Sequence, residues 1–273
     1  MYFLRSNKAT AAIVLKSDSK AIAFEKGKIM PTPLEWDTAS PKLPKQPPLV
    51  IGEIRGVLPY SGHRNPMSLS SVAKRISMTI ATRATKGQPK LYHFESAAEM
   101  ATALDCLRSP RLFGLEVQLP PFPYKLPSGR WQDHYMDEVI TFDDGFRRAV
   151  FVRNEESLKK PQTREEIAAI REALPLEIAD DMVVVNGNQY TKVWRDNLRR
   201  VWKALQRPDP DVDSYVLDRV NNSNFWLLRE LIANCDLPKS EVYQSTLRLI
   251  GRDQIKANWR CVFDYTSRIR RVS

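Results

Sequence analysis

The chain has few of the residues that build disulfide frames or His-rich and Cys-rich metal centres. Among its 273 residues there are three cysteines and three histidines, all far apart. They are Cys106, Cys235, Cys261, His63, His93 and His134. An odd number of widely spaced cysteines argues against a disulfide framework or a zinc site, and predicts small buried residues in a reducing compartment.

Long apolar runs are also missing from the sequence. No stretch approaches the roughly 20 apolar residues that span a membrane. The first residues lack the apolar core of a signal peptide. We therefore expect a cytoplasmic protein that has no membrane partner.

Basic residues are abundant. Lys and Arg number 42 against 32 Asp and Glu, which gives a net charge of +10 and favours an anionic partner, above all nucleic acid. The segment Arg64–Tyr92 contains six Lys or Arg and no acid. We predict DNA contacts by Lys74, Arg75, Arg83 and Lys86. A basic face that only contacts solvent is the alternative.

The pattern along the chain predicts three regions. Residues 1–60 are proline-rich between Pro31 and Pro48, which predicts an extended arm. The run Leu49–Pro59 has the composition of a strand. Residues 61–207 mix helical and strand patterns, which predicts an α/β domain with a mixed sheet flanked by helices.

Residues 208–273 form the third predicted region. They open with a linker, 208–213, and continue with three helical stretches. The run Trp259–Tyr265 then reads as a strand. Helices followed by a strand outline a small C-terminal helical or winged-helix-like domain.

Three local signals are specific within the central region. Ser96 is an expected N-cap of a helix over Ser96–Leu107, with Glu99 completing a capping box. The turn at 143–145, Asp-Asp-Gly, predicts a hairpin between strands at 133–142 and 147–153. Thr163 is an expected cap for a helix over Thr163–Leu174.

Acidic residues of this region suit phosphodiester hydrolysis, in which carboxylates hold a divalent cation that activates water. The candidates are Glu99, or Glu95 one helical turn earlier, and Asp137. Strand alternation places Phe151 and Arg153 on one face. The Phe151 side chain has no atom that can bind a metal ion. Arg153 keeps its positive charge but does not release a proton to a reacting group. Singly, each acid also fits an ordinary role as a helix cap or an ion-pair partner.

Four short segments carry a resemblance to a known family. They are Glu95–Glu99 (ESAAE), Glu116–Pro120 (EVQLP), His134–Asp137 (HYMD) and Phe151–Arg153 (FVR). In order and spacing, over roughly residues 50–205, the chain resembles the TnsA-type endonuclease subunit of heteromeric transposases. That family is a branch of the PD-(D/E)xK restriction-endonuclease-like nucleases.

The resemblance implies a restriction-endonuclease-like fold with Glu99 and Asp137 as ligands of Mg²⁺ or Mn²⁺. Phe151 then stands where the family has an acid or Gln, and Arg153 stands where it has the catalytic lysine. Met136 replaces a proline. Members cut donor DNA at transposon ends together with a DDE-type transposase and an ATPase regulator, which implies a nucleoid-associated protein.

Because the departures fall on the catalytic strand, three functions stay open. The first is a DNA endonuclease subunit, in which Glu99 and Asp137 hold the metal and Arg153 neutralises phosphate charge. The sequence does not decide whether Glu116, Glu138 or Glu155 compensates for Phe151, and Glu116 is the best candidate of the three. The second is a subunit that keeps the fold, binds DNA or the transposase, and cuts nothing. The third is a basic regulator that reads DNA through its C-terminal domain, since Gln244–Ser273 holds seven Lys or Arg against two Asp.

Overall fold

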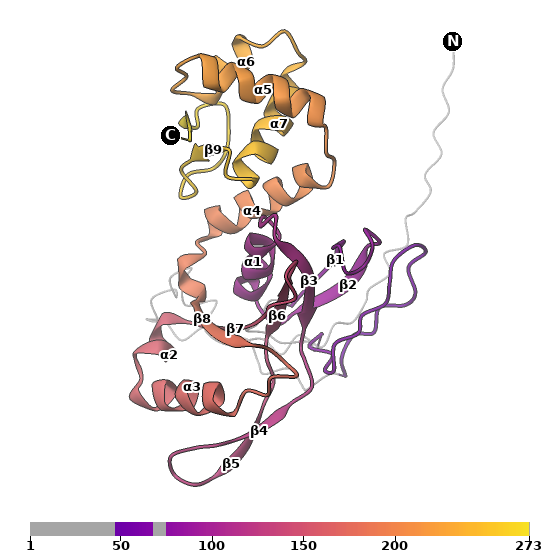
Figure 1. Cartoon of the computed structure of the whole chain (residues 1–273), viewed down its shortest axis with the longest axis vertical. Helices are drawn as coiled ribbons and strands as arrows, with labels where there is room; N and C mark the ends of the chain where they lie inside the picture. Colours follow the sequence, from indigo (N-terminus) through magenta and orange to yellow (C-terminus); the bar gives the residue numbers. More distant parts are fainter. Residues whose placement is uncertain (1–46, 68–74, 273) are drawn as a thin grey trace, which may run out of the picture. The chain divides into compact units, whose positions relative to one another are not determined.

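A mixed four-stranded sheet carries the candidate site in this computed structural model, which describes residues 47–67 and 75–272 (Figure 1). In spatial order the strands are β3 (Leu112–Val117), β6 (Glu138–Phe142), β7 (Arg147–Arg153) and β8 (Asp181–Asn186). The first three are antiparallel, and β8 is parallel to β7. The expected α/β class with a mixed sheet flanked by helices is confirmed.

Within the described part of the chain, three antiparallel strand pairs lie outside this sheet. They are β1 (Ile76–Ile80) with β2 (Lys90–Phe94), β4 (Phe122–Lys125) with β5 (Trp131–His134), and β9 (Ile255–Ala257) with β10 (Ile269–Arg271). The helices are α1 (Ala97–Cys106), α2 (Glu155–Lys159), α3 (Pro161–Ala173), α4 (Lys192–Leu205), α5 (Pro210–Asn222), α6 (Leu228–Ala233) and α7 (Lys239–Gly251), with a 3₁₀ turn, η2 (Gly187–Gln189).

The central sheet is apolar on both faces. Val150 and Val152 of β7 pack in one cluster with the buried face of α1. Ala149 and Phe151 belong to a second cluster with the buried residues of α3. Successive side chains of a strand point to opposite faces, so β7 fills both layers. This alternation decides which side chains reach the candidate site.

Two of the local signals form as expected. Ser96 caps α1, and its hydroxyl accepts a hydrogen bond from the Glu99 amide. The turn at 143–145 joins β6 to β7, and Gly145 adopts φ +84°, a left-handed conformation that glycine tolerates without a steric cost. Both signals are local in sequence, which is why sequence alone can locate them.

A third apolar cluster lies in the C-terminal part. Residues of α5, α6 and α7 enclose it together with Ile255 of β9 and Ile269 of β10. Helix α4 joins the clusters, since Leu198 packs on the α1 side and Val201 packs among the C-terminal residues. Among the described residues, no helix is long and apolar enough to cross a membrane.

In the first two regions one expected strand and one expected helix cap are wrong, whereas the helix expected over Thr163–Leu174 forms as α3. Over Leu49–Pro59 no strand forms, and only Leu58 makes an isolated bridge, to Lys90. This run contains two glycines, one of them at φ +77°, which weakens an extended strand. Helix α3 begins at Pro161, not at a Thr163 cap, because proline suits the first helical position. The arm over 31–46 lies outside the described residues.

Two expectations for the C-terminal region are also wrong. The supposed linker 208–213 is largely helix, since Asp209 caps α5 by accepting from the Val212 amide at 3.2 Å. The run 259–265 is not a strand. The buried amide of Asn197 replaces a strand partner there: it donates to the Cys261 carbonyl at 2.7 Å and accepts from the Phe263 amide at 3.0 Å. A side chain thus satisfies backbone groups that a sheet would otherwise pair.

Candidate active site

Glu99 reaches the candidate site from the first turn of α1. Its carboxylate accepts hydrogen bonds from the Glu95 amide at 2.8 Å and from the Ser96 hydroxyl at 2.9 Å. The side chain is nevertheless buried. Burial first, and then the charge of Asp137, raises the pKa of Glu99 to about 7. The predicted helix acid therefore lies close to the predicted strand acid.

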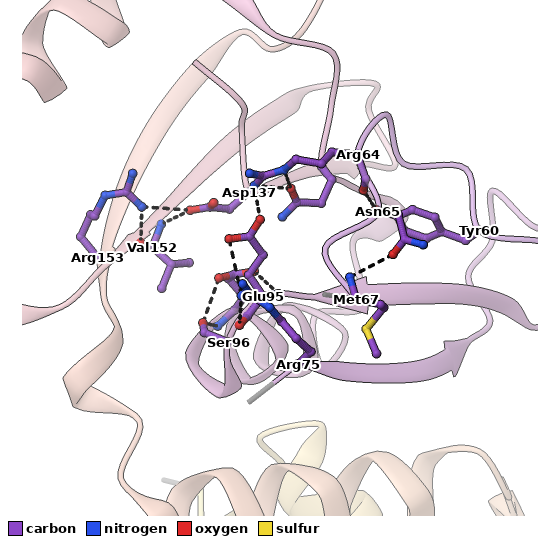
Figure 2. Close-up of polar contacts among 12 residues, drawn as sticks. Tyr60, Arg64, Asn65, Met67, Arg75, Glu95, Ser96, Asp137, Val152 and Arg153 are labelled. Carbon is purple, nitrogen blue, oxygen red and sulfur yellow. Dashed lines mark hydrogen bonds and ion pairs between the residues drawn. The ribbon is translucent and has the colours of Figure 1, made fainter. Parts of the chain in front are cut away.

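Asp137 lies immediately before β6 and is held by the neighbouring strand. Its carboxylate accepts from the Val152 amide at 2.9 Å, and the Arg153 guanidinium lies 3.8 Å away (Figure 2). Burial raises the pKa of Asp137 to about 6, although Arg153 and the Val152 amide lower it. The three residues predicted as catalytic thus come together at one end of the sheet.

Glu138 is a third acid at this place. It is fully buried, and neither of its carboxylate oxygens has a hydrogen-bond partner among the described residues. Burial raises its pKa well above the ordinary range, and the charges of Glu99 and Asp137 add to the shift. A buried carboxylate without a partner is costly, so this interior favours the neutral form of Glu138.

The other two candidates for the missing acid are engaged elsewhere. Glu116, which we favoured from the sequence, binds Arg147 at 2.9 Å and is half-exposed. Glu155 pairs with Lys159 at 2.9 Å in the first turn of α2. Glu138, rather than Glu116, is the acid that the structure brings to Glu99 and Asp137.

Phe151 is core, not a site side chain. It is fully buried, with its ring 4.7 Å from the His134 ring in an edge-on arrangement. The Arg153 guanidinium lies 3.6 Å from the centre of the Phe151 ring. Burial, and then Arg153, lowers the pKa of His134 to about 4. The acid position of the resemblance therefore holds an apolar contact that anchors Arg153.

Two further cations, Arg64 and Arg75, lie beside Glu95. The sequence did not single out Arg64. Arg64 pairs with Glu95 and donates to the Gln118 side chain at 2.9 and 3.1 Å (Figure 2). Arg75 donates to the Glu95 carbonyl at 2.8 Å. Gln118 has φ +51°, an uncommon conformation for a residue other than glycine. Signals for these residues were present: Arg64 opens the acid-free segment, and Gln118 belongs to the EVQLP motif.

Of the four predicted DNA contacts, the three that the structure describes do not form one cluster. Arg75 is engaged beside Glu95, as described above. Arg83 donates to the carbonyls of Leu112 and Pro110 at 2.9 and 3.0 Å. Lys86 is exposed in a turn, and Lys74 lies outside the described residues. DNA contact by these residues stays a prediction.

The oxygen donors suit a hard divalent cation such as Mg²⁺ or Mn²⁺, and the unpartnered oxygens of Glu138 fit such an ion. Within residues 47–67 and 75–272, however, no three His, Cys, Asp or Glu side chains form a ready metal-binding group. Both carboxylate oxygens of Glu99 already accept hydrogen bonds at the start of α1. Binding a cation therefore requires the Glu99 side chain to change its conformation. No protein-family model matches the chain, and no curated protein matches it.

Burial of Glu138 gives a pH-dependent prediction for the variant Glu138→Gln. The folded protein keeps the Glu138 proton at pH values where the unfolded chain has lost it. Wild-type stability is therefore full below the unfolded pKa of 4.5 and falls as pH rises toward the folded pKa. Relative to wild type, Glu138→Gln should therefore become more stable as pH rises above 4.5, by at most about 1.4 kcal/mol for each pH unit.

Urea denaturation in EDTA at several pH values measures this difference. The buried histidines titrate in the wild type and in Glu138→Gln alike, so their contribution cancels in the difference between the two free energies of unfolding. The exposed Glu155→Gln variant is the control for losing a carboxylate and should follow the wild-type curve. If the free energies of unfolding of wild type and Glu138→Gln changed in parallel with pH, the raised pKa of Glu138 would be contradicted.

Proposed function

We propose that this chain is a DNA-cleaving subunit of a heteromeric, TnsA/TnsB-like transposition system, which hydrolyses phosphodiester bonds at transposon ends. One observation carries the proposal. Glu99 and Asp137 converge with Glu138 in a buried place, where burial raises the pKa of all three and the charge of Asp137 adds to the shifts of Glu99 and Glu138. Buried acids with raised pKa values are typical of functional sites.

The residues have distinct roles in this proposal. Glu99, Asp137 and Glu138 would hold Mg²⁺ or Mn²⁺, which would polarise the phosphoryl group and lower the pKa of the attacking water. The Val152 amide orients Asp137. Arg153, fixed on the Phe151 ring, neutralises phosphate charge but takes no part in proton transfer.

The order of elements supports the proposal. Helix α1, strands β3, β6 and β7, helix α3 and strand β8 follow the sequence of elements that the resemblance implies. The finer fold, a restriction-endonuclease-like core with a winged-helix-like C-terminal domain, is part of the proposal. So are the division at residues 60 and 207, the DDE-type transposase and ATPase partners, and the place at the nucleoid.

Phe151 favours one alternative. A fully buried aromatic at the acid position, covered by Arg153, also fits a nuclease-like subunit that binds DNA or the transposase and does not cut. In that case the buried acids are remnants that destabilise the fold. The two functions predict opposite results in a single cleavage assay.

That assay follows nicking of supercoiled plasmid and of transposon-end DNA by the full-length protein, with and without its partner transposase. We expect nicked product with Mg²⁺ or Mn²⁺ and none with EDTA. DNA binding is measured in parallel by gel shift. Binding without nicking under all metal conditions would support the non-cleaving alternative and overturn the proposal.

A further inference from the structure

A groove of about 700 Å³ lies in the C-terminal region, away from the carboxylates. Its walls come from the end of α5, the loop before α6, and strands β9 and β10. Lys256, Arg270 and Arg271 line it together with the aromatic Trp226. No Asp or Glu of the described chain belongs to the lining.

Trp226 is presented to solvent by a backbone that is fixed. Its side chain is 71% exposed. Its amide donates to Glu230 at 3.0 Å, and its carbonyl accepts from the Ile269 amide at 3.1 Å. Leu227 forms a bridge with Arg268 immediately beside it. A large aromatic left in water on an ordered backbone is a ready surface for stacking.

The cations of the groove are crowded. Lys256 and Arg270 are direct partners in the antiparallel pair β9–β10, and like charges directly opposite one another are destabilising. The nearest acid is the exposed Asp253, 3.7 Å from Lys256. A bound anion between Lys256 and Arg270 removes this repulsion. Charge and shape therefore point to an anionic ligand that also carries an aromatic ring.

We propose that this groove binds single-stranded DNA. Phosphates contact Lys256, Arg270 and Arg271, while an unpaired base stacks on Trp226. Single-strand binding sites combine these two features, a basic track and an exposed aromatic. The inference does not depend on cleavage, because none of the groove residues belongs to the carboxylate site.

Fluorescence anisotropy with a labelled oligothymidylate tests the groove on the full-length protein in EDTA. Trp226→Ala should weaken binding roughly ten-fold, since stacking on an aromatic contributes on that order. Trp226→Phe should retain most of the affinity. Trp131→Ala is the matched control, because Trp131 is 64% exposed on β5, outside the groove, and its loss should change nothing.

The charges are tested in the same assay by varying salt. Arg270→Ala should weaken binding and reduce its salt dependence by about one released ion. Arg260→Ala, an exposed arginine outside the groove, should not. Equal binding by wild type and Trp226→Ala would overturn the proposal. It would also be overturned if an acidic peptide bound the groove while Trp226→Ala and Arg270→Ala left DNA binding unchanged. None of these variants alters the carboxylate site, so failure here and failure of cleavage are distinguishable.

Discussion

Asp137→Asn should reduce metal-dependent nicking by more than about 100-fold while the protein stays folded. In the proposed function Asp137 is a metal ligand, and loss of an outer partner of such a ligand already costs about 10–100-fold, so loss of the ligand itself should cost at least as much. Asparagine keeps an oxygen that can accept from the Val152 amide, which preserves the 2.9 Å contact at the start of β6. The substitution removes the negative charge of Asp137, which attracts Arg153 and would also attract a bound metal ion. Binding to transposon-end DNA should remain.

The matched control for this variant is Glu116→Gln. Glu116 lies on the neighbouring strand β3 and loses the same charge, but its partner is Arg147 and not the buried acids. Its nicking rate should equal that of wild type. If Asp137→Asn also nicks at the wild-type rate, the cleavage comes from another site or from a contaminant. Thermal denaturation of both variants shows whether each is folded.

The sequence is sufficient to predict the helix cap at Glu99 and the hairpin that follows Asp137, because both depend on local signals. Ser96 and Glu99 are three residues apart in one capping box, and the cap forms as expected. Asp137 precedes a strand whose hairpin turn is unambiguous, with Gly145 in the left-handed conformation that the turn requires. Local chemistry of this kind needs no knowledge of the partner elements.

Glu138 is one of three candidates that the sequence offers for the missing acid, but local signals do not favour it over Glu116. Strand alternation places neighbours on opposite faces, so an acid next to Asp137 is expected to point away from it. The strand, however, begins only at Glu138, and Asp137 lies before it and turns to the Val152 amide. Both acids therefore reach one interior. Whether the strand begins at Asp137 or at Glu138 decides whether the two acids share one interior. The sequence does not specify the end of a strand to a single residue.

Long-range packing explains the remaining differences. Which face of β7 receives α1 and which receives α3 depends on the whole layer arrangement, so the burial of Phe151 under Arg153 is visible only in the fold. The run 259–265 reads as a strand, but the amide of Asn197 pairs with its backbone from α4. Tertiary contacts override strand propensity here.

Asp213→Ala should lower the free energy of unfolding by about 3–5 kcal/mol, because removing one partner leaves a buried charge without compensation. Asp213 was expected in a linker but lies in α5. It accepts from Arg248 Nε at 2.8 and 3.0 Å and from Arg252 at 2.7 Å. The side chains of Asp213 and Arg248 are both 5% exposed. Alanine therefore leaves Arg248 buried with only the Arg207 carbonyl, at 3.1 Å.

The sign of the pH dependence follows from the pKa of Asp213. Burial raises this pKa, but hydrogen bonds from Arg248, Ser245 and Arg252 outweigh it and hold it below the ordinary value of 3.8. The contribution of Asp213 is therefore present above pH 3.8 and is lost as pH falls through the folded pKa. Urea denaturation at neutral pH captures the full effect.

Asp218→Ala is the control, since Asp218 is an exposed acid on the same helix and its loss should change stability by less than about 0.5 kcal/mol. A similarly small loss for Asp213→Ala would mean that water replaces the carboxylate at Arg248. Arg248 and Arg252 belong to α7 or directly follow it, and Asp213 belongs to α5, so the ion pair joins two helices of the C-terminal cluster. The groove at Trp226 is built on that cluster, so Asp213→Ala should weaken single-stranded DNA binding only under conditions in which it also unfolds this part of the chain.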